Sequence, residues 1–136
     1  MEHSFFALMS RMRYIARWGL MRNSLPENIQ EHSHMVAVLA HSLAVIGRDV
    51  FGKDTKPEAC AAAALYHDAS EILTGDLPTP IKYHNPAIRD SYKEIERLAG
   101  EKLLGFLPEE LRASFAPLLR PEGGETEAYV KAADKL

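Results

Sequence analysis

Apolar residues in the first half of the chain recur at the spacing of an amphipathic helix. Near the N-terminus they are Phe5, Leu8, Met9, Met12 and Ile15. This spacing places their side chains on one face and predicts a packed first helix. A connection over residues 19–28 follows, and a second apolar stripe then consists of Val36, Leu39, Leu43 and Ile46. The pattern predicts two helices joined by a loop.

Residues 57–73 (PEACAAAALYHDASEIL) predict a third helix. Pro suits a first turn, Ala has the highest helix propensity, and Gly75 followed by Pro78 and Pro80 ends the helix. The next segment, 75–86, is rich in turn-forming residues and also carries several polar side chains. Long polar loops in small domains are often functional, so we expect this loop to contribute to a site.

The last third of the chain continues the helical pattern. A fourth helix is expected over residues 87–107, and its inward residues would be Ile88, Tyr92, Ile95, Ala99 and Leu103. Pro108 opens a shorter fifth helix, whose apolar residues are Leu111, Phe115 and Leu118. Glu125 or Thr126 begins a sixth that ends at residue 136 without a cap or stop signal, which indicates a piece of a longer protein. With no strand pattern and no repeat, the prediction is one all-α domain of about six helices over residues 1–136.

Composition narrows the partners and the compartment. Sixteen basic and nineteen acidic residues give a net charge of −3 without a basic run, so we expect no nucleic-acid partner. Cys60 is the only cysteine, so no intrachain disulfide forms, and a reducing cytoplasmic location is expected. Neither a signal peptide nor an apolar run near the ~20 residues of a membrane span is visible, so no membrane partner is expected.

The dipeptide His67-Asp68 is the first candidate for chemistry. On the expected helix, His67 and Glu71 share a face, and Asp68 lies about 100° around the axis from His67. Imidazole nitrogen and carboxylate oxygen suit a divalent cation, and Glu71 would be left beside it. A His-Asp dipeptide also arises by chance, so a half-buried, hydrogen-bonded structural pair is the alternative.

Two distant residues offer further ligands. His32 precedes Val36 by four residues and therefore projects from the apolar stripe of the second helix. Asp134 follows Val130 by four residues, which again places a carboxylate on an apolar side, where an unpaired charge is costly and a cation would compensate. His34 and His41 face other directions, so His32 is the favoured histidine.

The order His32, then His67-Asp68, then Asp134 resembles that of the HD-domain metal-dependent phosphohydrolases. Within this group the chain closely resembles the YfbR-like 5′-deoxynucleotidases, over nearly its whole length and with the HD core at about residues 28–136. The segments that carry the resemblance are RWGLMRN (17–23), ENIQEHS (27–33), YHDASEILTGDLPTPIKY (66–83) and KAAD (131–134). The dipeptide alone is a weak signal, whereas the run HDASEILTGDLPTPIKY is very specific.

The resemblance implies a helical HD-domain bundle that hydrolyses deoxyribonucleoside 5′-monophosphates to nucleoside and phosphate, with low base selectivity. It implies one divalent ion, with cobalt preferred and manganese, copper, zinc, nickel or iron accepted, and it implies a homodimer. The ligands carried over are His32, His67, Asp68 and Asp134. The chain departs from the family at Gly19, where relatives have proline, and it lacks the family's C-terminal helices after Asp134.

Residue types suggest roles around such an ion. Glu71 would act as general acid or base, and Arg17 would bind the phosphate with two donors and stabilise its charge during transfer. Trp18 would exclude a 2′ hydroxyl beside the sugar, and the alternative, which the sequence alone favours, is a tryptophan packed in the core. The resemblance implies the substrate contacts Arg17, Trp18, His32, Asp68, Asp76, Leu77, Pro78, Thr79 and Asp134, with Asp76 accepting from the 3′ hydroxyl.

Two other functions remain open at this point. An HD phosphohydrolase for deoxynucleoside triphosphates or signalling nucleotides would need more cationic residues than Arg17, Arg22 and Lys82 offer. A non-catalytic helical interaction module would use the same histidines and aspartates structurally. Metal content separates the second alternative from the enzyme, because a structural network needs no stoichiometric ion.

Overall fold

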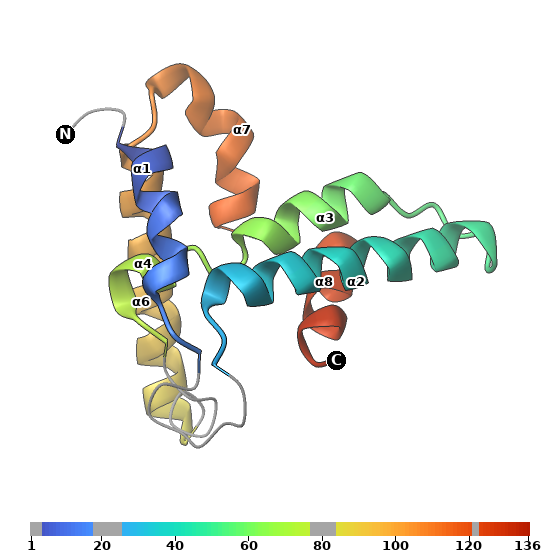
Figure 1. Ribbon diagram of the computed structural model, residues 1–136, viewed down its shortest axis with the longest axis horizontal. Helices are drawn as coiled ribbons and strands as arrows, with labels where there is room; N and C mark the ends of the chain where they lie inside the picture. The colour runs from blue at the N-terminus through green and yellow to red at the C-terminus, as the bar shows by residue number, and fades with distance from the viewer. Residues whose placement is uncertain (1–3, 18–25, 77–83, 121–122) are drawn as a thin grey trace.

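The computed structural model describes residues 4–17, 26–76, 84–120 and 123–136, and helices make up its architecture (Figure 1). The elements are α1 (Phe5–Met9), the 3₁₀ helix η1 (Ser10–Tyr14), α2 (Ile29–Asp49), α3 (Pro57–Tyr66), α4 (Glu71–Thr74), α6 (Pro86–Gly105), α7 (Glu109–Leu119) and α8 (Glu125–Asp134). Within these ranges the only β-type pairing is an isolated antiparallel bridge between Ala16 and Asn28. The all-α prediction is therefore confirmed.

Helices α2, α3 and α8 pack against one another and form one arm of the molecule (Figure 1). Their shared core consists mainly of small side chains: Val36, Ala37, Ala40, Ala44, Cys60, Ala64, Val130 and Ala133. Small side chains allow helix axes to approach closely, which brings the start of α2 and the ends of α3 and α8 together.

The buried face of α2 differs from the predicted stripe. Val36 is buried and Leu39 and Leu43 are half-buried, but Ile46 is 46% exposed. The core side is instead occupied by Ala37, Ala40 and Ala44 together with Gly47. The periodicity predicted the helix correctly but placed its buried face too far around the helix axis. The alanines that allow close packing carry a weaker hydrophobic signal than larger side chains.

The second arm contains α1, α4, α6 and α7 (Figure 1). Its core is Phe5, Ala69, Leu103, Leu104 and Leu107, and the ring of Phe115 packs edge-on against Phe5 at 5.3 Å and against Tyr66 at 5.7 Å between centroids. These aromatic contacts tie the N-terminal segment and the end of α3 to α7.

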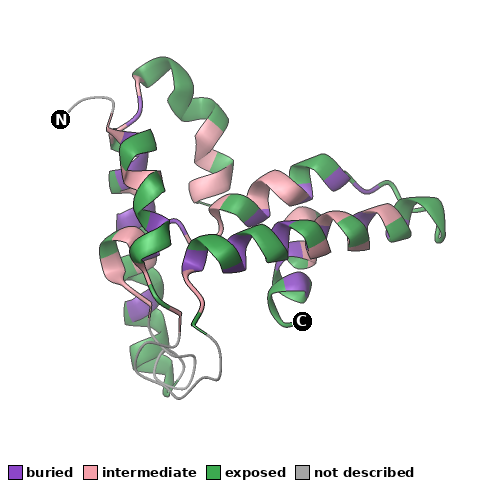
Figure 2. Cartoon of the chain, in the orientation of Figure 1, coloured by how far each residue is buried: buried purple, intermediate pink, exposed green. Residues whose placement is uncertain are grey.

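Several positions on this arm are more exposed than the sequence suggested. Tyr92, Ala99 and Leu103 are buried as predicted, whereas Ile88 and Ile95 are exposed. Leu111 is also exposed, and α7 has no fully buried residue. Figure 2 shows exposed and half-buried residues along α7 and much of α6.

The N-terminal helix is shorter than predicted. Helix α1 ends at Met9, the chain tightens into η1, and Ile15 is extended with φ −97° and ψ 104°. Phe5 and Met12 are nevertheless buried as the spacing predicted. Among the described helices, none is long and apolar enough to cross a bilayer.

Candidate metal centre

Helix α3 ends one residue before His67, so the predicted continuous helix over 57–73 is wrong. Residues 67–70 form a turn whose backbone bonds span three residues, such as the bond from the Glu71 N–H to the Asp68 carbonyl at 3.0 Å. The break follows from His67, whose Nδ1 lies 2.6 Å from the carbonyl of Ala64. That carbonyl would otherwise accept the next α-helical bond. His67 and Glu71 are therefore not related by the α-helical geometry that the sequence suggested.

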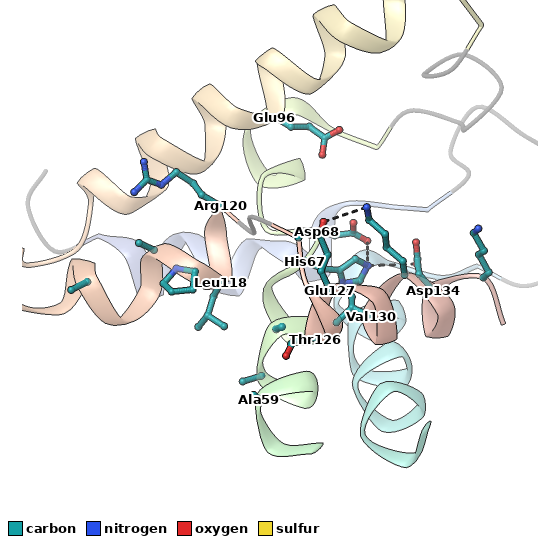
Figure 3. Close-up of a pocket in the computed structure, with 18 of the residues that line it drawn as sticks. Ala59, His67, Asp68, Glu96, Leu118, Arg120, Thr126, Glu127, Val130 and Asp134 are labelled. Atoms are coloured by element: carbon teal, nitrogen blue, oxygen red, sulfur yellow. Dashed lines mark ion pairs between the residues drawn. The ribbon is translucent and has the colours of Figure 1, made fainter. Parts of the chain in front are cut away.

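The turn, the start of α2 and the end of α8 bring four predicted ligands together. His32, His67, Asp68 and Asp134 each offer one nitrogen or oxygen atom, and these four atoms lie within 4.8 Å of one another. His32 Nε2 is 2.6 Å from Asp134 Oδ1, and His67 Nε2 is 3.2 Å from Asp68 Oδ2 and 3.5 Å from Asp134 Oδ1. Figure 3 shows His67, Asp68 and Asp134 directed toward one another. The sequence thus predicted a group of side chains able to bind a metal.

Burial of the four residues agrees only partly with expectation. His32 is 8% exposed, as an apolar-face histidine should be, and His67 and Asp68 are half-buried. The side chain of Asp134 is 43% exposed, so it is not the buried carboxylate that its spacing from Val130 suggested. It is the last residue of α8 and follows Ala133, which is 1% exposed.

The cluster attracts positive charge. Contact with His32, and then with His67, holds the pKa of Asp134 well below its usual range despite partial burial. Burial on its own lowers the pKa of His67, but the nearby Asp134 and Asp68 carboxylates and the Ala64 carbonyl outweigh it and raise the pKa to about 10. Two carboxylates thus favour a cation among them, whether a proton or a metal ion.

The donors also fit a divalent ion. Because His67 Nδ1 can donate its proton to the Ala64 carbonyl, Nε2 is the ring nitrogen that a metal ion would bind in place of the second proton, and backbone carbonyls commonly fix the tautomer of ligating histidines in this way. Nε2 is a buried atom without a hydrogen-bond partner of suitable geometry. Two imidazoles and two carboxylates form a donor set that transition metals and zinc accept.

A cavity of about 1180 Å³ opens beside the cluster. His67, Asp68 and Asp134 lie on its wall with Arg17, and small apolar side chains of α3 and α7 line another part of it: Ala59, Ala62, Ala63, Ala113, Ala116 and Pro117. Figure 3 shows Glu96 on α6, and Arg120, lying apart from His67, Asp68 and Asp134. The ligand group is therefore open to a small molecule.

The other predicted site residues either do not line this cavity or lie outside the described residues. Glu71 is 5% exposed at the first position of α4, three residues after Asp68, and Asp76 is half-buried just beyond α4. Neither lines the cavity within the described part of the chain. Trp18, Leu77, Pro78 and Thr79 lie outside the described residues.

The sequence did not single out some charged residues of the cavity. Lys131, Lys135, Arg120, Glu96 and Glu127 all line it. Lys131 precedes Asp134 by three residues, so helical spacing could have identified it. Arg120 and Glu96 line the same cavity as residues of α8 only because of the tertiary fold. No local sequence pattern could have identified them.

The helical fold and the histidine-aspartate group define an HD-domain phosphohydrolase. An HD-domain phosphohydrolase of Listeria innocua superposes with a TM-score of 0.86 at 24% identity, covering 98% of this chain and 64% of that one. A cyanophage S-2L HD phosphohydrolase bound to dA and one catalytic Zn²⁺ ion has a TM-score of 0.66 at 25% identity, covering 98% of this chain and 68% of that one.

The family is narrower than this class. The model of the YfbR-like 5′-deoxynucleotidases matches residues 4–136, and a 5′-deoxynucleotidase of Vibrio parahaemolyticus is 51% identical over 99% of this chain and 71% of its own length. The chain belongs to the YfbR-like 5′-deoxynucleotidase family. The predicted family and the predicted class, a phosphoric monoester hydrolase, are confirmed.

Proposed function

We propose that the cluster of His32, His67, Asp68 and Asp134 holds one divalent ion and hydrolyses deoxyribonucleoside 5′-monophosphates. The convergence of the four donor atoms within 4.8 Å is the observation that carries this proposal. Family membership supports the reaction, because the similar proteins are 5′-deoxynucleotidases. When bound, the ion polarises phosphate oxygen and lowers the pKa of coordinated water.

The protein's own side chains supply the other parts of the reaction. Arg17 lines the cavity beside the ligand group, and its planar guanidinium suits two oxygens of a phosphate. Glu71 is buried in the chain segment that also provides His67 and Asp68, and we assign it proton transfer to or from water and the departing 5′ oxygen. His32, Asp68 and Asp134 would contact substrate from the ligand sphere.

Selection of the sugar is assigned to two further segments. Trp18 follows Arg17 directly and would exclude a 2′ hydroxyl by its bulk. The run Asp76, Leu77, Pro78 and Thr79 would bind the sugar, with Asp76 accepting from the 3′ hydroxyl.

Charge balance in the cavity favours a monophosphate over a triphosphate. Among its described lining residues, four are cationic (Arg17, Arg120, Lys131 and Lys135) and four are acidic (Asp68, Glu96, Glu127 and Asp134). Three of the cations already have acidic neighbours, since Arg17 lies 2.7 Å from Glu27, Arg120 lies 3.3 Å from Glu101 and Lys131 lies 3.4 Å from Glu127. One divalent ion would give a net charge near +2, which matches a dianionic monophosphate and leaves a triphosphate undercompensated.

The proposal also covers the preferred metal ion, the oligomeric state and the cellular location of the protein. We propose that cobalt is preferred and that manganese, copper, zinc, nickel or iron can substitute, because a mixed nitrogen and oxygen set discriminates weakly among these ions. A homodimer, a cytoplasmic location and the absence of a nucleic-acid partner complete the proposal. The net charge of −3 supports the last of these.

Product analysis tests the substrate class. Metal-loaded protein is incubated separately with 2′-deoxyadenosine 5′-monophosphate, adenosine 5′-monophosphate and 2′-deoxyadenosine 5′-triphosphate. We expect nucleoside and phosphate from the first substrate and much slower turnover of the other two. Release of inorganic triphosphate from the third substrate would replace the proposal with the triphosphohydrolase alternative, and equal turnover of the first two would refute deoxy selection.

A further inference from the structure

Arg17 is held by Glu27 through both its side chain and its backbone. The guanidinium Nη1 donates to Glu27 Oε2 at 2.7 Å, and the Arg17 N–H donates to the Glu27 carbonyl at 2.8 Å. The side chains are 21% and 36% exposed, so the ion pair is partly shielded from water. Glu27 therefore holds both the backbone and the guanidinium group of Arg17 in place.

The same pairing joins Arg17 to the helix that carries a metal ligand. The Ile29 N–H donates to the Ile15 carbonyl at 2.9 Å, and Ala16 and Asn28 form the antiparallel bridge between the two segments. Asn28 is the N-cap of α2, where its side chain accepts from the Glu31 N–H at 2.8 Å.

His32 is bound to this N-cap directly. Its backbone N–H donates to the Asn28 carbonyl at 3.1 Å, which is the first hydrogen bond of the ligand-bearing turn. The segment 27–29 therefore contacts Arg17 on one side and begins the turn of His32 on the other. This short path fixes Arg17 relative to the metal-ligand group.

A guanidinium beside two ligand carboxylates needs such a restraint. Arg17 shares the cavity wall with Asp68 and Asp134, and a mobile arginine would be attracted to these oxygens. An ion pair at one end of the planar group orients its other donors and reduces the entropy lost when phosphate binds.

We propose that Glu27 is a positioning residue that orients Arg17 toward substrate phosphate. The inference rests on the proposed function, in which Arg17 binds that phosphate. Glu27 itself touches neither the substrate nor the ion in this account. Its effect must therefore depend on the presence of Arg17.

Calorimetric titration of cobalt-loaded protein with inorganic phosphate tests this dependence without turnover. The variants are Glu27→Ala, Glu27→Gln, Arg17→Ala and the double alanine variant, and each is also assayed for KM and kcat with 2′-deoxyadenosine 5′-monophosphate. We expect Glu27→Ala to weaken phosphate binding about three- to ten-fold and to raise KM similarly, with bound metal unchanged. In the Arg17→Ala background, the same change should have no further effect on phosphate affinity.

Glu94→Ala is the matched control, because it removes an exposed ion pair of 2.6 Å with Arg97 on α6. It should leave phosphate affinity unchanged. If Glu27→Ala fails to fold, Glu27→Gln carries the test, since it keeps the side-chain shape and removes the charge. We expect Glu27→Gln to weaken binding in the same direction by a smaller factor.

The outcomes separate the two proposals. If Arg17→Ala weakens phosphate binding but the Glu27 variants bind like wild type, the Glu27 inference is overturned and the proposed function stands. The inference would also be overturned if Glu27→Ala weakened phosphate binding by the same factor in the wild-type protein and in the Arg17→Ala variant. If Arg17→Ala itself binds phosphate like wild type, the phosphate role of Arg17 fails, and the Glu27 inference fails with it.

Discussion

Replacing Gly100 by alanine should push helices α6 and α7 apart. A Cβ atom added at Gly100 would lie 2.6 Å from the backbone oxygen of Leu119, whereas ordinary contacts begin at 3.4 Å. The difference requires a shift of about 0.8 Å, and the obstacle is backbone at the end of α7, which has no rotamer to change. The cost must therefore be met by movement of the helices.

The magnitude follows from two opposing terms. Alanine gains about 1 kcal/mol over glycine in helix propensity, while overpacking a fitted contact costs about 1–3 kcal/mol. Gly105, the last residue of the same helix, has nothing within 4 Å of an added Cβ, so Gly105→Ala gains propensity without the steric cost. Gly100→Ala should therefore be less stable than Gly105→Ala by about 1–3 kcal/mol.

Urea unfolding followed by circular dichroism measures this difference. The midpoint should fall for Gly100→Ala and stay level or rise for Gly105→Ala, with similar slopes. Helix α7 contributes Ala113, Ala116 and Pro117 to the cavity, so Gly100→Ala should also change KM without loss of metal. Equal or greater stability of Gly100→Ala would refute the close approach of α6 and α7.

Three further substitutions test the assigned roles. Glu71→Ala should lower kcat at least about 100-fold while metal analysis finds the ion retained, and a near-normal rate would remove Glu71 from proton transfer. His67→Ala should lose stoichiometric metal, whereas His41→Ala, at a half-buried position on α2 outside the ligand group, should keep it. Trp18→Ala should increase the kcat/KM for adenosine 5′-monophosphate relative to its deoxy counterpart, and an unchanged ratio would contradict steric exclusion of the 2′ hydroxyl.

The sequence predicted most of the helices and a group of side chains able to bind a metal, because both produce local or motif-level signals. Asn28 begins α2 through a capping box with Glu31, and Pro86 and Glu109 open helices within one or two residues of the expected positions. The order of His32, His67-Asp68 and Asp134 predicted a set of side chains that the fold brings within reach of one ion.

The sequence could not predict features that depend on tertiary contacts. A helix made of PEACAAAALYHDASEIL has no breaker before Gly75, yet it ends at Tyr66 because a His67 side chain occupies the Ala64 carbonyl. Ile46 and Ile95 are exposed because helix packing, and not hydrophobicity alone, selects the buried face. The ion pair of Arg17 with Glu27 joins residues ten positions apart in the sequence, and hydrophobic periodicity carries no signal for such a pair.

The central claim is that activity requires one ion held by His32, His67, Asp68 and Asp134. The most direct measurement titrates cobalt into EDTA-treated protein while recording both bound metal and phosphate release from 2′-deoxyadenosine 5′-monophosphate. We expect release to rise in proportion to binding and to saturate at one ion per chain, with neither signal in His67→Ala. Full release without bound metal, or equal metal binding by His67→Ala, would contradict the account.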